Sequence, residues 1–177
     1  LAQGSSASGF ENVCRYCGRT HRAAPMPGDL ATTNGRQYAP DRQVDVLHIK
    51  LDVTPDFNEH TVAGTATLRF KPISKPLESL RLDAVNLDVS DVRSPQAVRD
   101  YSSDGKNLTI VFKEPVPVGV EATVEIDYSA EPVQGLYFRT SGMNLPAGDD
   151  HCWTQGEPHE ARHWFPSFDY PNDRSST

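Results

Sequence analysis

A five-residue run near the end of the sequence has the residue types and spacing of a metal site. It reads His159-Glu160-Ala161-Arg162-His163 and matches the pattern H-E-x-x-H. On a helix, this spacing puts the two imidazoles on one face, one turn apart, with the glutamate close enough to polarise a metal-bound water. Taken alone, the pattern makes His159 and His163 candidate zinc ligands.

The residues that follow argue against a catalytic zinc ion at this run. A catalytic site needs a third protein ligand, and Asp169 is the candidate if the pattern continues as H-E-x-x-H-x-x-G-x-x-H/D. That continuation needs glycine at position 166, but Pro166 stands there and fixes φ at about −65°. The alternative, a glutamate on a later helix, is not found before Thr177. We therefore expect no catalytic zinc ion at this run.

A second candidate chelate lies near the start of the sequence. Cys14 and Cys17 form a C-x-x-C pair followed by Gly18 and His21, and two thiolates at this spacing can bind one ion. A structural zinc site needs four ligands, and the sequence has no second C-x-x-C pair. A local disulfide or two free thiols is the simpler interpretation. Attachment of c-type haem is disfavoured because Gly18 stands where histidine is needed.

The elements around these candidates are predicted to be strands. Apolar and polar residues alternate in four long runs and two short ones: 45–53, 62–70, 108–112, 120–128, 80–82 and 87–89. Turn residues separate the runs, and no part of 43–150 has the period of a long amphipathic helix. This pattern predicts an all-β domain, an antiparallel β-sandwich or saddle.

The two ends of the chain lack the strand pattern of this central region. Residues 1–42 are rich in Gly, Ser, Pro and Thr without a sustained period, which predicts an irregular N-terminal arm. Residues 151–177 follow a polar loop. Within them we expect Trp153–Glu157 to be extended and His159–Phe165, between two prolines, to form about two helical turns.

Composition excludes two classes of partner. The chain has 17 Lys and Arg against 24 Asp and Glu, a net charge of −7, and its basic residues are scattered. We therefore expect no nucleic-acid partner. No apolar run approaches the ~20 residues of a membrane span. The small, polar residues 1–9 are typical of what remains after signal-peptide removal, or of a tail, which favours an extracytoplasmic location over a cytoplasmic one.

A longer pattern in residues 154–171 is more specific than H-E-x-x-H. It resembles the segment T-Q-x-E-x-x-x-A-R-x-x-F-P-C-F-D-x-P of the aminopeptidase N-like zinc metallopeptidases, the gluzincin aminopeptidase family. The matching positions are Thr154, Gln155, Glu157, Ala161, Arg162, Phe165, Pro166, Phe168, Asp169 and Pro171. Gly135-Leu136-Tyr137 resembles the family's preceding G-L-Y/F element, and the strands from residue 43 onward resemble its N-terminal β-saddle domain. Ser167 departs from the pattern, because many members have cysteine there.

The resemblance implies that the H-E-x-x-H match is incidental. His159, Glu160 and His163 fall at variable positions of the family segment. In members of the family the catalytic zinc motif, its downstream glutamate and a G-A-M-E-N-type loop all lie in the next domain. None of these elements is in the 177 residues. We therefore expect an N-terminal domain that has no cofactor of its own, is inactive alone, and has as its partner the catalytic domain that holds the zinc ion.

The resemblance also assigns a binding role to two residues. It implies that Glu157 pairs with the α-ammonium of a peptide N-terminus and that Gln155 accepts a hydrogen bond or shapes the first side-chain pocket. In an extended strand, residues i and i+2 project to the same side, so both can reach one cleft. We expect Arg162 to form an internal ion pair, with Asp169 as the candidate partner. The aromatic residues expected at the domain junction are Trp153, Trp164, Phe165 and Phe168.

Two other classes of protein remain open from the sequence. One is a stand-alone β-sandwich that acts as a binding or scaffold module, including a non-catalytic relative of the peptidase family. The other is a small metal-binding protein that uses either His159 and His163 or Cys14 and Cys17.

Overall fold

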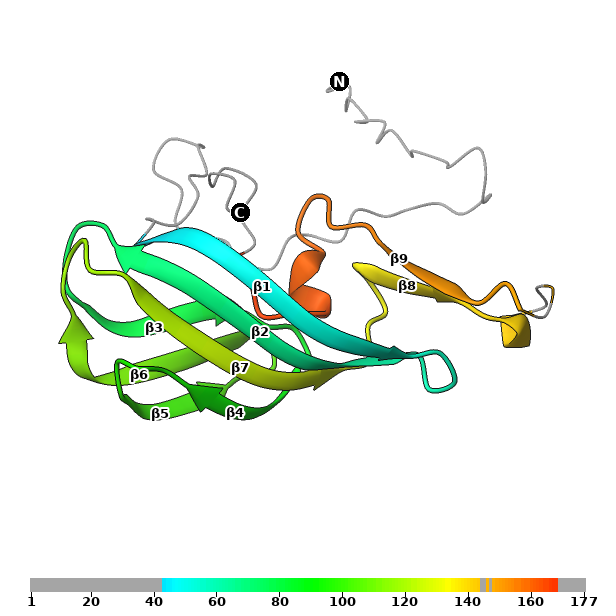
Figure 1. Cartoon of the computed structure of the whole chain (residues 1–177), viewed down its shortest axis with the longest axis horizontal. Coiled ribbons are helices and arrows are strands. Elements are labelled where there is room, and N and C mark those ends of the chain that lie inside the picture. Colours follow the sequence, from blue (N-terminus) through cyan, green and yellow to red (C-terminus); the bar gives the residue numbers. More distant parts are fainter. Residues whose placement is uncertain (1–42, 144–145, 147, 169–177) are drawn as a thin grey trace, which may run out of the picture. The chain divides into compact units, whose positions relative to one another are not determined.

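The structure is a computed structural model that describes residues 43–143, 146 and 148–168, and these residues form an all-β domain (Figure 1). The strands are β1 (Val44–Asp56), β2 (Thr61–Pro72), β3 (Leu77–Asp83), β4 (Asp88–Arg93), β5 (Val98–Ser103), β6 (Asn107–Val116), β7 (Ala122–Ala130), β8 (Leu136–Arg139) and β9 (His151–Thr154). Two short 3-10 helices, η1 (Ser141–Met143) and η2 (Ala161–His163), complete the elements of this part of the chain.

The strands form a two-layered antiparallel sandwich and a separate hairpin. One layer has the strand order β1-β2-β7-β4, and the other has the order β3-β6-β5. Strands β8 and β9 pair only with each other among the described elements. Figure 1 shows the two layers stacked, with the β8–β9 hairpin beside the turn that joins β1 to β2. The predicted antiparallel sandwich is confirmed.

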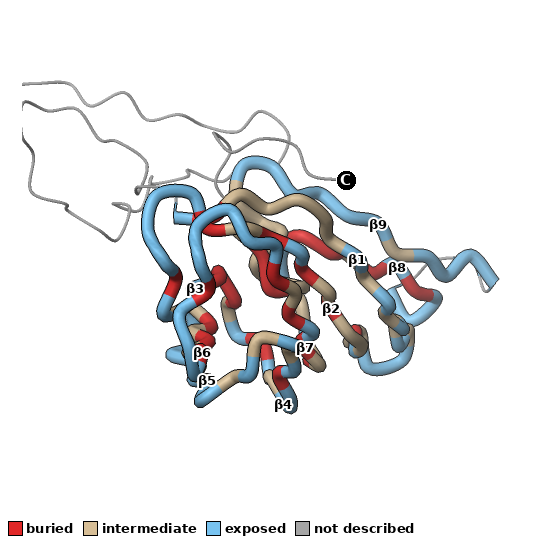
Figure 2. The backbone as a smooth tube through the Cα atoms, turned by 60° about the vertical axis from the view of Figure 1, so that its left-hand side comes forward, coloured by how far each residue is buried: buried red, intermediate tan, exposed pale blue. Residues whose placement is uncertain are grey.

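The core lies between the two layers, and alternate residues of β2, β6 and β7 are buried there (Figure 2). The rings of Phe70 on β2 and Phe112 on β6 are 6.3 Å apart, which joins the layers directly. The most deeply buried apolar side chains around them are Leu68, Leu82, Leu108, Ile110, Val124 and Ile126. Burial of this many branched side chains is the main stabilising contribution to the fold.

Three strands lie outside the predicted runs, and the predicted helical segment is shorter than expected. Strand β5 is mostly polar and exposed, and β8 and β9 are four residues each, so none shows a long alternation. Between Pro158 and Pro166 only the 3-10 helix η2 forms. Two prolines this close leave too few residues for an α-helix to nucleate favourably.

Several predictions fall outside the described residues. The irregular arm 1–42, with Cys14 and Cys17, is among them, and so is Asp169. No helix of the part of the chain that the structure describes is long and apolar enough to cross a membrane.

Candidate functional site

The signature segment, residues 154–171, begins on the β8–β9 hairpin, whose register is well defined. In the antiparallel pair β8–β9, Tyr137 lies opposite Trp153, and their rings stack at 5.5 Å with an interplanar angle of 22°. The backbone N–H of Gln155 donates to the carbonyl oxygen of Gly135 at 2.9 Å, which adds one hydrogen bond beyond the end of β9. The backbone of the segment is therefore anchored as far as Gln155.

The hairpin is held against the sandwich by the turn between β1 and β2. Phe57 packs edge-on against Phe138 of β8 at 5.7 Å, and His60 stacks on the same ring at 5.6 Å. The Nε2 atom of His60 also lies 3.2 Å from the Oγ1 atom of Thr140, within hydrogen-bond distance. These contacts tie a short two-stranded ladder, which would be marginal alone, to the larger sheet.

Beyond Gln155 the chain makes a turn that is closed by residue 160. The backbone N–H of Glu160 donates to the carbonyl oxygen of Gly156 at 3.0 Å, and the phenol of Tyr137 donates to Glu160 Oε2 at 2.8 Å. This hydrogen bond, together with desolvation, raises the pKa of Tyr137 above its ordinary value. Residue 160 therefore links the turn to β8 through both its backbone and its side chain.

Glycine is required at position 135 for two reasons. Gly135 has φ of +80°, in the left-handed region that disfavours side chains. A Cβ there would overlap the carbonyl oxygen of Glu160, and it would lie 2.8 Å from the carbonyl carbon and 3.0 Å from Cδ1 of Trp164. The backbone of residue 160 packs directly on this glycine, which explains why the G-L-Y/F element begins with glycine.

The second half of the segment is attached to the end of β3. Nη1 of Arg162 lies 3.5 Å from Oδ1 of the nearly buried Asp83, and the carbonyl oxygen of Arg162 accepts the N–H of Val85 at 2.9 Å. Asp83 and Ser167 exchange two backbone hydrogen bonds, of 2.7 and 3.0 Å. Arg162 does form an ion pair as expected, and its partner among the described residues is Asp83.

Ser167 is the position at which the segment departs from the family pattern. Its side chain is buried, and its Oγ atom has no hydrogen-bond partner in the part of the chain that the structure describes. A buried hydroxyl without a partner destabilises the fold, whereas cysteine behaves as a small apolar residue. The environment therefore suits the cysteine of other family members better than the serine.

Gln155 and Glu157 are both exposed to solvent, but they do not lie on one strand. Strand β9 ends at Thr154, and Glu157 lies in the turn 157–160. The predicted extension to Glu157 is therefore wrong, and the alternation of a strand gives no reason for the two side chains to share a direction. The cause is the turn closed by Glu160, which cannot be read from local periodicity.

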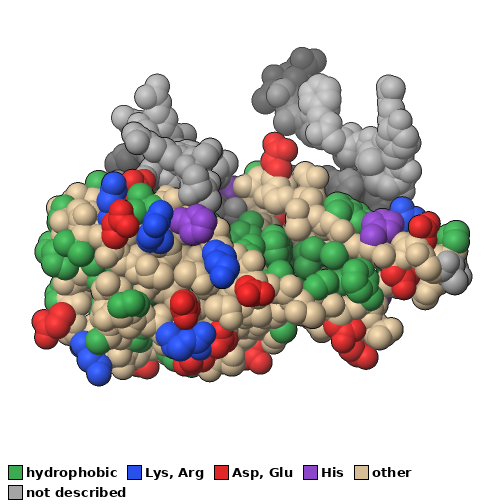
Figure 3. Space-filling view, in the orientation of Figure 1, with side chains coloured by type: hydrophobic (Ala, Val, Ile, Leu, Met, Phe, Trp, Pro, Cys, Tyr) green, Lys and Arg blue, Asp and Glu red, His purple; other side chains and the backbone are tan. Residues whose placement is uncertain are grey.

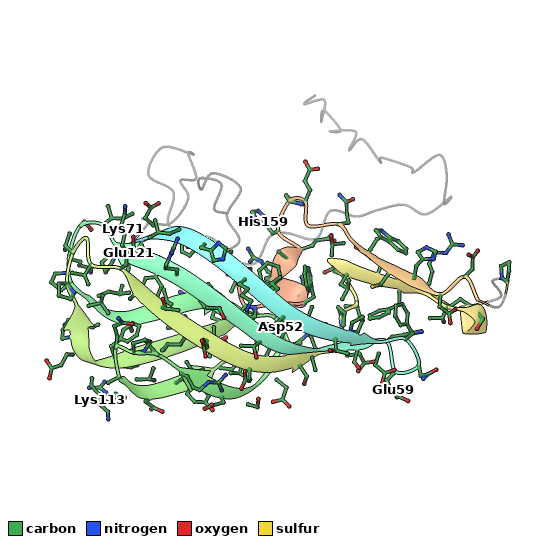
Figure 4. All side chains as sticks on the ribbon, viewed as in Figure 1. Asp52, Glu59, Lys71, Lys113, Glu121 and His159 are labelled. Carbon is green, nitrogen blue, oxygen red and sulfur yellow. The ribbon has the colours of Figure 1, made fainter. Side chains whose placement is uncertain are left out.

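The two histidines of the H-E-x-x-H run are half-buried, and they do not lie on the α-helix that the motif requires. His159 precedes η2 in the turn (Figure 4). His163 is the last residue of η2. A 3-10 helix has about three residues per turn, so positions i and i+4 do not share a face as they do on an α-helix. Among the described residues, no group of three or more His, Cys, Asp or Glu side chains could hold a metal ion.

The aromatic residues expected at a domain junction differ in exposure. Trp153 is 44% exposed, whereas Trp164 and Phe165 are half-buried, with their rings 4.6 Å apart, and pack against the core. Phe168 is also half-buried. Trp153 is therefore the member of this set that offers an open apolar surface, and the junction itself stays a prediction.

Charged side chains of both signs are interspersed on the face that Figure 3 shows, without a continuous basic surface.

On the outer side of the four-stranded layer, Arg93 of β4 forms hydrogen bonds or ion pairs with Asp91, Glu125 and Asp127. The pKa of Asp127 is lowered to about 2, mainly by its hydrogen bonds with Arg93 and to a smaller extent by the hydrogen bond from Thr65. This cluster joins strands of one sheet, so its role is structural.

The combination of this sandwich, its hairpin and the anchored segment agrees with a comparison to known protein families. Residues 45–177 match the Peptidase M1 N-terminal domain family. Since the match covers most of the sequence, this chain belongs to the M1 family of metallopeptidases, as an N-terminal domain.

Relatives with curated descriptions are much longer than this chain. Aminopeptidase 2 of Candida albicans is 23% identical over 168 residues, which cover 92% of this chain and 18% of the relative. The mitochondrial Aminopeptidase 2 of Saccharomyces cerevisiae is 24% identical over 178 residues, which cover 94% of this chain and 18% of the relative. The chain thus spans about a fifth of the length of these relatives.

Solved structures share the fold at low sequence identity. The M1 zinc metallopeptidase of Deinococcus radiodurans superposes with a TM-score of 0.59 and 24% identity, over 75% of this chain and 30% of that one. A variant of the same protein is described as bound to a Tyr-Ser-Ala substrate. The leukotriene A4 hydrolase of Saccharomyces cerevisiae gives a TM-score of 0.59 at 20% identity, over 75% of this chain and 22% of that one.

Proposed function

We propose that this chain is the substrate-contributing N-terminal domain of a zinc-dependent aminopeptidase. In this proposal, the Glu157 carboxylate pairs with the α-ammonium group of a peptide, and Gln155 accepts a hydrogen bond at the same end of the substrate. One observation carries the proposal. The chain presents both residues of the signature as exposed side chains on a backbone anchored by the bonds from Gln155 to Gly135 and from Glu160 to Gly156.

The chemistry of an aminopeptidase explains why such groups are needed. The enzyme must place the first peptide bond at one fixed distance from a free amino group. An ammonium is recognised by acceptors and negative charge, and hydrogen bonds to charged groups are stronger than neutral ones. Groups fixed before the substrate arrives also reduce the entropy lost on positioning it. An exposed carboxylate on an anchored turn meets both requirements.

The zinc ion belongs, in this proposal, to another part of the full-length protein. Both relatives are aminopeptidases by description, and the superposed Deinococcus protein is a zinc metallopeptidase. The described residues of this chain do not fit a catalytic zinc ion, because they offer no cluster of three ligands. The chain alone is therefore expected to bind the amino end of a substrate without cleaving it.

Kinetics of the full-length protein test this role. Glu157→Ala and Glu157→Gln should lower kcat/KM for a panel of aminoacyl-p-nitroanilides by about 10- to 100-fold, since each removes one charge-assisted interaction. The matched control is Glu131→Gln, at an exposed glutamate in the loop after β7, which should leave kcat/KM unchanged. Unchanged kinetics in both Glu157 variants would remove Glu157 from the site. If the wild-type full-length protein cleaved none of the probes, the chain would be a binding module.

A further inference from the structure

Glu160 is held at two points, although the family pattern that the segment resembles does not fix the residue at this position. Its carbonyl packs on the bare Cα of Gly135, and its carboxylate accepts the hydrogen bond of Tyr137 at 2.8 Å. Tyr137 is itself restrained, because its ring stacks on Trp153 at 5.5 Å. These contacts join β8, β9 and the turn that carries Glu157 into one connected unit.

We propose that Tyr137 and Glu160 are a positioning pair that fixes the turn 157–160 and thereby the Glu157 carboxylate. This inference rests on the proposed function, because it assigns the pair a task only if Glu157 binds the substrate amino group. Neither member of the pair touches the substrate. Both act through the backbone of the turn, which Glu160 closes by donating its N–H to Gly156.

The need for such a pair follows from the exposure of the turn. Glu157 is on the surface and β9 has already ended, so the strand ladder does not restrain it. A binding group must be held to within about 0.5 Å of its productive position, and restraint of this kind comes from supporting hydrogen bonds and packing. The hydrogen bond from Tyr137 to Glu160 is a side-chain contact of this kind, and it connects the turn to the hairpin.

The pair also gives the glutamate of the H-E-x-x-H run a different task from the one that the motif suggests. In a zinc site that glutamate faces a metal-bound water. Here its carboxylate is engaged by the phenol of Tyr137. Positioning therefore replaces proton transfer as the role of Glu160.

The test uses the full-length protein with aminoacyl-p-nitroanilides as probes. Tyr137→Phe and Glu160→Ala should each raise KM by about 3- to 10-fold while kcat changes less, as expected for the loss of one hydrogen bond that positions a binding group. Glu160→Gln keeps an acceptor oxygen for the phenol and should stay close to wild type. Tyr101→Phe is the control, because the Tyr101 hydroxyl donates to Ser90 at 3.1 Å, between β5 and β4, and its loss should leave KM unchanged.

A second background separates positioning from general destabilisation. If the pair acts through Glu157, Tyr137→Phe should add nothing to the KM of a Glu157→Ala variant, because coupled residues are not additive. Additive effects would overturn the inference, as would unchanged KM in Tyr137→Phe and Glu160→Ala when Glu157→Ala alone raises it. If Glu157→Ala itself had no effect, the proposed function would fail and the inference would fail with it.

Discussion

Gly135→Ala should destabilise the domain strongly, because position 135 is restricted by both its backbone angle and its surroundings. The residue has φ of +80°, and the new methyl group would overlap the carbonyl of Glu160 and press on the ring of Trp164. The carbonyl is backbone and cannot rotate away as a flexible side chain would. Relief requires the turn 157–160 to move away from β8.

The expected loss can be estimated from these two contributions. A side chain in the left-handed region costs about 1–2 kcal/mol, and an extra methyl group in a packed site costs about 1–3 kcal/mol. The free energy of unfolding should therefore fall by about 2–5 kcal/mol, a large share of the ~5–15 kcal/mol typical of a domain.

Gly105→Ala is the matched control for this measurement. Gly105 has nearly the same φ, +81°, but a Cβ there would have no neighbour within 4 Å. The two variants share the backbone strain and differ in the close approach. Urea unfolding of both, followed by tryptophan fluorescence, should give a loss that is larger for Gly135→Ala by about 1–3 kcal/mol. Equal losses would refute the reasoning that residue 160 packs on Gly135.

Three further predictions concern other parts of the domain. Ser167→Cys should raise the free energy of unfolding by about 1 kcal/mol in the same urea assay, because it removes a buried hydroxyl that has no hydrogen-bond partner among the described residues. Asp127→Asn should lower the thermal midpoint much more at about pH 6 than near pH 2. The pKa of Asp127 is depressed to about 2, so its stabilising effect is fully present above the unfolded pKa of about 3.9 and is lost as pH falls through about 2. Equal destabilisation at both pH values would contradict this assignment. His159→Ala should leave the zinc content of the full-length protein unchanged by elemental analysis, and loss of zinc would restore the H-E-x-x-H interpretation.

The sandwich could be predicted from the sequence because its signal is local. In the run 62–70, the structure buries Val62, Ala66, Leu68 and Phe70, which is the alternation that the prediction rested on. Position 64 of the same run is glycine because a Cβ there would overlap the carbonyl oxygen of Asp52 on the neighbouring strand. Period-two patterns survive in such strands because one face is buried.

The geometry of the site could not be predicted, because it depends on contacts between distant residues. Tyr137 contacts Glu160, and Arg162 contacts Asp83, across long stretches of sequence, so the periodicity of the sequence does not indicate these pairs. Strand β9 is too short to show an alternation, and the end of the strand at Thr154 follows from the turn that Glu160 closes. The family segment predicted a candidate site at Gln155 and Glu157, but the argument that both lie on one strand failed for this reason.

Recognition of a substrate amino group by Glu157 can be measured with a pair of inhibitors. Inhibition constants of leucine amide and of its analogue without the amino group should be measured on the full-length protein and on Glu157→Gln. The wild type should prefer the amine by about 10- to 100-fold, which is the strength of one charge-assisted contact, and the variant should lose most of that preference. An unchanged preference in Glu157→Gln would show that Glu157 does not recognise the amino group.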